Sequence, residues 1–518
     1  MDFSKEVSDL SQAEQLGEAF MPRLEADTYL DDPDYAEEIN QLVQHHLVGG
    51  FCVFNGTPES AAGSILALQK IALESHGVPL LFSCDCEWGL PMRLHRGGTE
   101  FPDMMALGRV KDAAQTEAIA KAIARELKAL GIHWNFAPVA DVNSNSKNPI
   151  IDTRSFGEDP ETVALNVEAY VRGLESERVA GSVKHFPGHG DTTVDSHKDL
   201  PKLVFKRDRF EQLEFPPFIR GIDAGVQSLM IAHIAIPELA KELGATSDEI
   251  DLPATLSAPL CRMIRDDWGY DGILVTDALE MHGLTKYFGN DDACLRSFSA
   301  GLDVLLIPVD VRSAHQHMLQ AIGSGELSEE KVRRSAERVL ALKRWVHSDQ
   351  EPDVNFVHDN EAHLSLARKA ARRAMQMNGA PPEQPFTGIV IFSDARATAV
   401  AKARYLTDRV NSTLPTALLT PETGITDFRS DVGERPLIVA LHKARGFIGG
   451  PADAATVPEL LREATTELAG YKDLSVVCLG SPYLDPLFED LNVSCMIKTF
   501  SESTTSIDAV LERLGGLL

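Results

Sequence analysis

Short apolar runs alternate with amphipathic segments through the first two-thirds of the chain. The runs are β-branched or aromatic and nearly continuous in hydrophobicity, which is typical of parallel strands buried on both faces. Eight such strands are predicted, at residues 18–24, 49–55, 79–85, 133–141, 181–186, 228–236, 272–279 and 303–308.

Helical spacing is clear between most of these runs. Residues 115–131 place their apolar side chains on one stripe, and residues 159–177 begin with Asp159 as a cap followed by Pro160. Ser257 and Gly269 mark the start and stop of another helix. Eight strands alternating with helices favour an α/β fold, a (β/α)8 TIM-type barrel, over an open sheet of the same elements.

The pattern changes after a predicted helix at 328–346. Residues 347–361 are polar and contain proline, which indicates a linker, and a helix is predicted from about 362 to 377. Four more strands are predicted at 388–394, 436–442, 473–480 and 494–500, with helical stretches such as 458–470 between them. We therefore predict a barrel at 1–346, a linker and connecting helix at 347–377, and a smaller doubly wound α/β domain at 378–518.

Composition narrows the class of protein. A chain of 518 residues is too long for one ordinary core, and its formal net charge of -28 disfavours nucleic acid and anionic membranes as partners. Seven scattered cysteines indicate no disulfide framework, and no apolar stretch is long enough to span a bilayer. The amino terminus has no basic segment followed by an apolar one. We expect a soluble, cytoplasmic protein, whose sequence carries no signal for its oligomeric state.

The segment that leaves the fifth strand is the richest in functional residue types. It runs K-H-F-P-G-H-G-D-T from Lys184 and continues to Asp195 and His197. Asp195 and His197 point the same way in an extended segment, and a carboxylate beside an imidazole suits a proton donor that later accepts a proton. Gly188 and Gly190 would let the backbone flex over a substrate.

Two alternative roles for this segment stay open. Asp195 and His197 could form an ordinary surface pair. The segment could also bind a metal, although it lacks a helical H-x-x-x-H spacing. The potential ligands are His185, His189, Asp191, Asp195 and His197.

A carboxylate ends the seventh strand. Asp277 follows four apolar or β-branched residues, where burial of a charge is costly without a partner or purpose. At the mouth of a barrel it could attack the anomeric carbon of a sugar. Its alternative role is to cap the following helix.

Other strand ends supply groups suited to sugar hydroxyls, and Trp88 could stack on a sugar face. Asp85 or Arg154 alone could equally form a structural salt bridge. The candidates are Asp85, Glu87, Trp88, Arg93, Asp141, Asn143, Arg154 and His233.

Two motifs, KHFPGHGDTTVDSH (184–197) and VTDALEM (275–281), resemble glycoside hydrolase family 3 in its bacterial β-N-acetylglucosaminidase branch. Supporting matches lie at 85–93, 135–143, 148–160 and 325–343, so the resemblance covers about residues 15–346. It implies Asp277 as nucleophile, His197 as acid/base and Asp195 as the residue that orients His197. It further implies a first sugar subsite made by Asp85, Arg93, Arg154, Lys184 and His185.

The resemblance implies a retaining β-N-acetylhexosaminidase that acts on a small carbohydrate through a covalent glycosyl-Asp intermediate, with no cofactor and no metal. In the β-glucosidase branch the acid/base is a glutamate from a later domain, so the D-S-H motif favours N-acetylglucosamine over glucose. A phosphorylase, a β-glucosidase, a metal-dependent hydrolase and a non-catalytic sugar-binding barrel stay open. So does the natural substrate, a muropeptide or a chitin fragment.

This chain departs from the family at one place. Many members carry Gln-Glu-Gly-Gly after the third strand, where this chain has Cys86, Glu87, Trp88 and Gly89. Asp85 and Arg93 keep their places, so the difference bears on the group beyond the first sugar.

Overall fold

A computed structural model describes residues 5–193, 199–346, 352–358, 360–394, 396–410, 414–423, 428–442 and 456–518. It forms two compact units. The barrel unit comprises residues 1–99, 113–145 and 158–363, and the C-terminal unit comprises 100–112, 146–157 and 364–518. The C-terminal unit thus includes two segments, 100–112 and 146–157, which we call the loop segments. The predicted domain bounds at 346 and 377 stay predictions.

The strands of the barrel unit close into a ring. Seven of them form a parallel sheet in the order β2-β3-β4-β5-β6-β7-β8. β1 lies just before β2 and pairs with β9, while Val304 bridges to Val275 of β8. The predicted (β/α)8 barrel is therefore confirmed, and the open-sheet alternative is wrong. The strands are β1 (Phe20–Met21), β2 (Arg23–Glu25), β3 (Gly50–Phe54), β4 (Leu81–Cys84), β5 (Trp134–Asn135), β6 (Ala180–Phe186), β7 (Ser228–Ile231), β8 (Ile273–Thr276) and β9 (Leu305–Leu306).

Helices connect these strands largely where the sequence predicts them. Asp159 caps α7 by accepting a hydrogen bond from the Thr162 backbone N–H at 2.9 Å, with Pro160 at the first helical position. The predicted helix after Ser257 is split into α11 and a π-helical turn, and the Ser257 side chain makes no capping bond. The helices are α1 (Gln12–Gly17), α2 (Ala26–Asp31), α3 (Pro33–Gln44), α4 (Pro58–Ser75), α6 (Ala113–Ala129), α7 (Pro160–Glu175), α8 (Arg207–Arg209), α9 (Phe215–Asp223), α10 (Pro237–Glu242), α11 (Ala258–Arg262), α12 (His282–Thr285), α13 (Asn290–Ala300), α14 (Val311–Ser324) and α15 (Glu329–Val346).

The interior of the barrel is packed with large side chains. Trp134 and Phe136 meet edge to face at 5.2 Å, and both are completely buried. The Trp134 Nε1–H donates to Ser228 Oγ at 2.9 Å, so the buried indole keeps a hydrogen-bond partner. The barrel is therefore a filled core, and chemistry belongs at its mouth.

The C-terminal unit is built on an open sheet in the order β10-β15-β14-β13-β11-β12. Strands β11 to β15 are parallel, which confirms the predicted doubly wound fold, and β10 is antiparallel at the edge. The sequence prediction missed β10 and β12, and it carried the preceding helix to 377, whereas α16 ends at Ala374. The strands are β10 (Gln376–Gly379), β11 (Gly388–Ser393), β12 (Thr416–Leu419), β13 (Pro436–His442), β14 (Leu474–Gly480) and β15 (Val493–Lys498).

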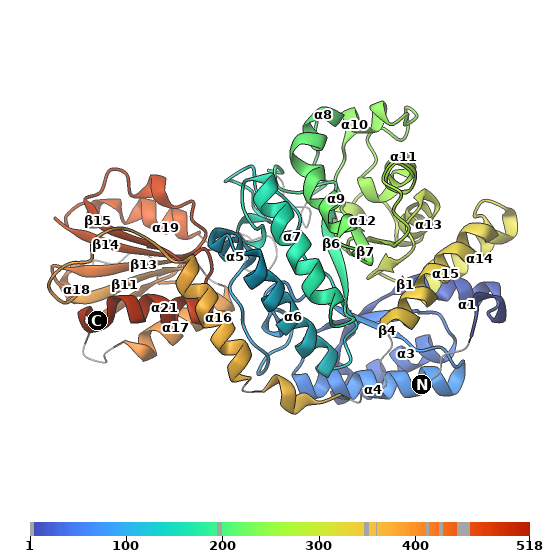
Figure 1. Cartoon of the computed structure of the whole chain (residues 1–518), viewed down its shortest axis with the longest axis horizontal. Coiled ribbons are helices and arrows are strands. Elements are labelled where there is room, and N and C mark those ends of the chain that lie inside the picture. The colour runs from blue at the N-terminus through green and yellow to red at the C-terminus, as the bar shows by residue number, and fades with distance from the viewer. Residues whose placement is uncertain are drawn as a thin grey trace. The chain divides into compact units, whose positions relative to one another are not determined.

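Helices cover both faces of this sheet (Figure 1). Val390 and Phe392 of β11 face the cluster that includes α19 and α20, whereas Ile389 and Ile391 face α17 and α21. This alternation with period two is the reason that β11 reads as a continuous apolar run. The helices of the unit are α5 (Met104–Val110), α16 (Glu361–Ala374), α17 (Ala397–Arg409), α18 (Arg429–Val432), α19 (Val457–Glu463), α20 (Thr465–Leu468) and α21 (Thr504–Leu514).

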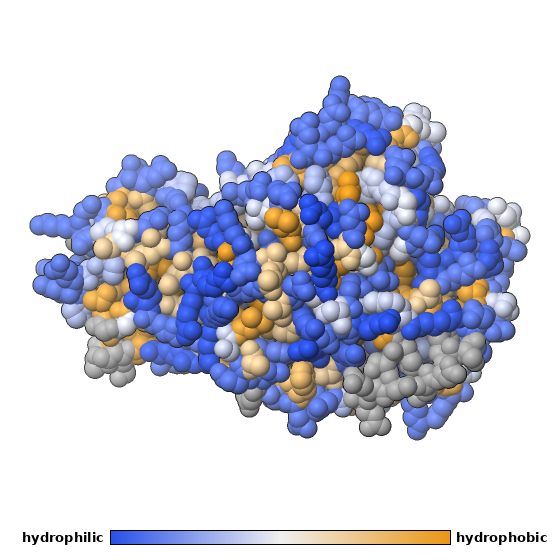
Figure 2. All heavy atoms as spheres, viewed as in Figure 1, coloured by the Kyte–Doolittle hydropathy of each residue, from blue (hydrophilic) through white to orange (hydrophobic). Residues whose placement is uncertain are grey.

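The surface in Figure 2 is mostly hydrophilic, with scattered apolar residues, in keeping with the charge of the chain. All seven cysteines are buried thiols. Among the described helices, none combines the length and hydropathy needed to cross a bilayer.

Candidate active site

The carboxyl ends of β4 and β6 carry a linked set of charges. Asp85, the residue after β4, accepts from Arg93 Nη2 through Oδ2 and from Lys184 Nζ through Oδ1, both at 2.7 Å. Lys184 also pairs with Glu87 at 2.8 Å. Burial alone would raise the pKa of Asp85, but Lys184 and Arg93 hold it well below its usual value. Three of the five residues that the resemblance assigns to the sugar subsite are therefore in direct contact.

These charges differ in exposure. The Lys184 side chain is 1% exposed, whereas those of Asp85 and Arg93 are 14% and 16% exposed. A ligand can therefore reach Asp85 and Arg93, while the buried Lys184 holds the Asp85 carboxylate in place. The result is a rigid, partly exposed acceptor and donor pair, which suits neighbouring sugar hydroxyls.

Neighbouring residues that the sequence analysis missed hold this set in place. The Arg93 guanidinium lies over the Phe54 ring, 4.6 Å from its centroid. Asn135 hydrogen-bonds the backbone N–H and carbonyl of Cys86, and Tyr170 donates to the carbonyls of Cys86 and Glu87. Phe54 and Asn135 end β3 and β5, so a rule that included aromatic and amide residues at strand ends would have found them.

A buried pair joins β6 to the segment after β5. His185 Nδ1 lies 2.7 Å from Asp141 Oδ2, and the backbone N–H groups of His185 and His189 also donate to this carboxylate. Burial would raise the pKa of Asp141, but the bonds from His185 and His189 lower it. An ionised Asp141 therefore fixes the proton of His185 on Nδ1 and orients the ring.

The segment after β6 is closely packed as far as it is described. Burial lowers the pKa of His189 to about 4, so this ring is neutral near pH 7. A Cβ on Gly190 would lie 1.7 Å from the Val142 carbonyl oxygen, and one on Gly188 would lie 2.6 Å from Glu214 Cγ. Glycine at these two positions meets a steric need. The predicted acid/base pair Asp195 and His197 lies outside the described residues.

Asp277 follows β8 directly, as predicted, and is half-buried. Its backbone N–H donates to Ile231 O, and its Oδ1 accepts from the Ala278 N–H at 2.8 Å. The next helix, α12, begins at His282 with Met281 as its cap residue. The alternative that Asp277 caps this helix is therefore wrong.

His233 lies beyond the end of β7 and is completely buried. Its Nε2 is 3.0 Å from the Ala278 carbonyl oxygen, and its Nδ1 is 2.9 Å from Thr255 Oγ1. A neutral imidazole satisfies both bonds by donating from Nε2 and accepting at Nδ1. His233 thus supports the backbone beside Asp277.

Two further candidates have different surroundings. Trp88 is only 9% exposed. Arg154 belongs to the C-terminal unit, where it ends the 3-10 turn Asp152–Arg154 and is 3% exposed. Within the part of the chain that the structure describes, no three His, Cys, Asp or Glu side chains are grouped as metal ligands would be.

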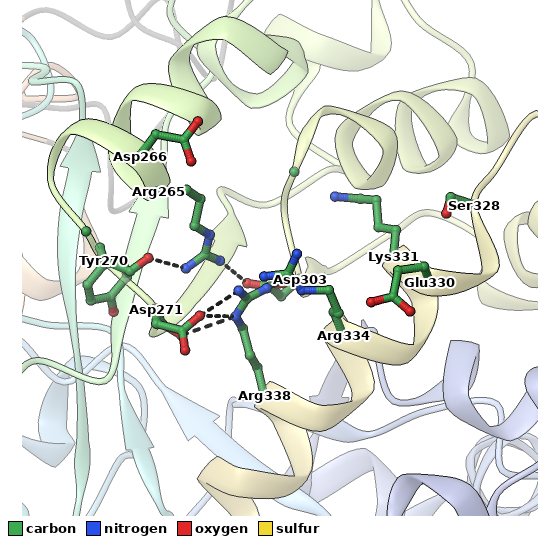
Figure 3. Close-up of a pocket in the computed structure, with 12 residues that line it drawn as sticks. Arg265, Asp266, Tyr270, Asp271, Asp303, Ser328, Glu330, Lys331, Arg334 and Arg338 are labelled. Carbon is green, nitrogen blue, oxygen red and sulfur yellow. Dashed lines mark hydrogen bonds and ion pairs between the residues drawn. The ribbon is translucent and has the colours of Figure 1, made fainter.

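A cavity of about 540 Å³ lies at the opposite end of the strands, before β8 and β9 (Figure 3). Its floor is an internal ion network in which Asp303 pairs with Arg265 and Arg338, and Arg338 also pairs with Asp271. In a (β/α)8 barrel this amino-terminal end serves stability, so the cavity is not the candidate active site.

The N-terminal domain of glycosyl hydrolase family 3 matches residues 6–342. β-Hexosaminidase A of Pseudoalteromonas piscicida is 36% identical over 362 residues, which are 65% of this chain and 60% of that protein. A β-N-acetylglucosaminidase/β-glucosidase of Cellulomonas fimi is 31% identical over 339 residues, 65% of this chain and 58% of that protein. The chain thus spans about three-fifths of the length of these relatives.

A solved family 3 β-N-acetylglucosaminidase from Paenibacillus sp. str. FPU-7 superposes with a TM-score of 0.82 at 27% identity, covering 98% of this chain and 97% of that one. The match to the family domain spans well over half of the chain and includes Asp85, Lys184 and Asp277. The chain belongs to glycoside hydrolase family 3.

Proposed function

We propose that this protein is a retaining β-N-acetylhexosaminidase that removes terminal β-linked N-acetylglucosamine from a small carbohydrate. One observation carries the proposal: the ends of β4, β6 and β8 bear a partly exposed Asp85, bound by Arg93 and Lys184, and a half-buried Asp277. The solved β-N-acetylglucosaminidase from Paenibacillus supports N-acetylglucosamine as the sugar, and the name of the Pseudoalteromonas relative supports hexosaminidase activity.

Asp277 acts as the nucleophile in this proposal. Its carboxylate attacks the anomeric carbon as the bond to the leaving group breaks, which gives a covalent glycosyl-Asp277 ester. The Ala278 N–H holds Oδ1, and His233 holds the Ala278 carbonyl, so the carboxylate is oriented before the sugar arrives.

His197 completes the cycle. As the acid it donates a proton to the departing oxygen, and as the base it takes a proton from the water that attacks the ester. Asp195 would hold its tautomer. Two inversions at the anomeric carbon return the original β configuration.

Sugar binding falls to Asp85, Arg93, Lys184, His185 and Arg154, following the resemblance. An ionised Asp85 accepts hydrogen bonds from hydroxyls, and Arg93 donates them. The Asp141 contact fixes the His185 ring in one orientation. We also propose a cytoplasmic location, which the seven buried thiols support.

The first test compares aryl β-N-acetylglucosaminide with aryl β-glucoside as substrates, each with and without inorganic phosphate and a chelator. We expect higher kcat/KM on the acetamido sugar, unchanged by the chelator. Activity on the glucoside alone would overturn the assignment of the sugar. Loss of activity with the chelator would contradict nucleophilic attack by Asp277 and would favour a metal-dependent mechanism. Conversion to a sugar 1-phosphate would identify a phosphorylase.

The second test uses His197→Ala with substrates of different leaving groups. A poor alcohol leaving group needs protonation and an activated aryl group does not, so we expect kcat to fall about a hundredfold or more for the former and far less for the latter. Equal losses on both would contradict the acid role.

A further inference from the structure

The cavity at the amino-terminal end of the barrel strands lies wholly within the barrel unit and takes no part in the proposed reaction (Figure 3). Its volume of about 540 Å³ is large enough for a small ligand. Its lining comes from three places: the turn before β8, the residues before β9, and the first turns of α15. Most of these side chains are charged, so charge would select the ligand.

The inner part of the cavity holds more positive than negative charge. Asp303 is 3% exposed and pairs with Arg265 at 2.5 Å and with Arg338 at 3.1 Å. These two arginines are only 17% and 16% exposed, and Lys331 is half-buried on the same lining. Three enclosed cations therefore share one enclosed carboxylate, which leaves an excess of two positive charges.

The other acidic residues of the lining do not remove this excess. Asp271 also pairs with Arg338, but its side chain is 87% exposed, so water screens its charge. Glu330 pairs with Arg333, which is not part of the lining. Asp266 is exposed to solvent. Burying charge without compensation is costly, so the enclosed cations would gain from an anion.

Lys331 is the enclosed cation whose charge is least compensated. Within the described ranges it forms no ion pair and no side-chain hydrogen bond. Its ammonium group points from α15 into the cavity and lies 5.4 Å from the centroid of the Phe298 ring (Figure 3). Burial lowers the pKa of Lys331, Asp303 opposes this shift, and the charges of Arg265 and Arg338 reinforce it.

We infer that this cavity binds a phosphate group, as inorganic phosphate or as a sugar monophosphate, with Lys331, Arg265 and Arg338 as the cations. A phosphate group carries about −1.5 to −2 charges at pH 7, which matches the excess, whereas a single carboxylate carries half of that. Guanidinium groups bind phosphate oxygens through paired N–H donors, and lysine binds them as a point charge. The exposed Arg334 adds a cation at the rim. Asp277 lies at the other end of β8, so phosphate binding here does not depend on the proposed reaction.

Isothermal titration calorimetry with inorganic phosphate tests the site. We expect saturable binding by the wild-type protein and a loss of affinity of about tenfold or more in Lys331→Met, because one charged contact is removed. Lys331→Arg keeps the charge and should bind more tightly than Lys331→Met. Lys241→Met is the matched control, since it removes a cation with an exposed pair to Glu238 and should bind as the wild type does. A parallel titration with N-acetylglucosamine 6-phosphate shows which source of the group binds more tightly.

Thermal unfolding distinguishes a ligand site from a purely structural ion network. Without phosphate, Lys331→Met removes an uncompensated cation, so we expect its Tm to equal or exceed that of the wild type. Phosphate should raise the Tm of the wild type and of Lys241→Met, but not that of Lys331→Met. A lower Tm of Lys331→Met without phosphate, with unchanged phosphate affinity, would assign Lys331 to stability alone and would overturn the inference.

Arg334→Met keeps the inference testable if Lys331→Met does not fold, because it changes an exposed residue. We expect it to weaken phosphate binding about threefold. No binding by the wild type at phosphate concentrations up to about 20 mM would overturn the inference. Binding that survives Lys331→Met and Arg334→Met but is lost in Arg93→Met would place the phosphate at the candidate active site and would overturn it as well.

Discussion

The two parallel sheets of this protein use their carboxyl ends differently. In the barrel unit, Asp85 and Arg93 pair there and remain 14% and 16% exposed. In the C-terminal unit, Asp394 and Arg396 pair at the corresponding edge but are 2% and 3% exposed, and Glu502 completes the set. Both arrangements satisfy the rule that charges at strand ends are paired. The difference in exposure indicates that a ligand can reach the Asp85–Arg93 pair, whereas the Asp394–Arg396 pair stabilises the interior of its unit.

The largest effect should come from the carboxylate at the end of β8. Asp277→Asn keeps the shape but removes the nucleophile, so we expect kcat to fall about a thousandfold or more. Asp271→Asn is the matched control, because Asp271 lies before the same strand, at the opposite end of the barrel. Comparable losses in the two variants would contradict the assignment of the active site to the carboxyl ends.

Replacing the arginine of each pair by methionine should distinguish a role in stability from a role in sugar binding. Arg396→Met removes the cation that pairs with both Asp394 and Glu502 in the interior, which should cost about 3–5 kcal/mol in the free energy of unfolding. Arg93→Met should cost less than this, because Asp85 keeps Lys184 as a cation, but it should raise KM about tenfold. Urea unfolding and steady-state kinetics measure both. Equal losses of stability would remove the distinction between the two edges.

Much of this comparison was open to prediction from the sequence. Most of the barrel strands, and β11, β13 and β14 of the C-terminal unit, are buried on both faces, so their apolar runs stand out. β10 and β12 are edge strands, and β10 has the polar, partly exposed sequence Gln376–Gly379, which carries no such signal. Motifs at strand ends located Asp85, Lys184 and Asp277.

The supporting contacts were not predictable, for a physical reason. Asp103 and Ser501 are 398 positions apart, and no local sequence pattern predicts the hydrogen bond between them. The sequence analysis accordingly assigned residues 100–112 to the barrel. Asp141 and His185 were both named as binding residues, but their pairing depends on two strands that lie side by side only after folding.

The ionisation of Asp85 gives a smaller effect with a definite sign. Lys184 and Arg93 lower its folded pKa below the unfolded value of about 3.8, so it stays ionised as pH falls to 4 and loses its charge only below that. Asp85→Asn should therefore reduce kcat/KM about ten- to a hundredfold at every pH from about 4 to 8, without moving the midpoint of the acid limb. A shift of that midpoint in the variant would show that Asp85 titrates in this range.

The smallest effect concerns Asp199, the first residue that the structure describes after residue 193, and its exposed contacts. Asp199 accepts from Tyr287 Oη at 2.6 Å and pairs with Lys286 at 3.0 Å, which places it against the segment that follows Asp277. These bonds lower the pKa of Asp199 to about 2, so the contact persists across the working pH range.

Asp199 is two residues from His197, so loss of its contacts should disturb the acid more than the nucleophile. We expect Asp199→Asn to lower kcat about two- to fivefold for a poor leaving group and by less for an activated one, since exposed pairs contribute little. Asp251→Asn is the control, because it removes an exposed pair with Lys202 instead. If both substrates slowed equally, the contact would act on the fold of the barrel mouth and not on proton transfer.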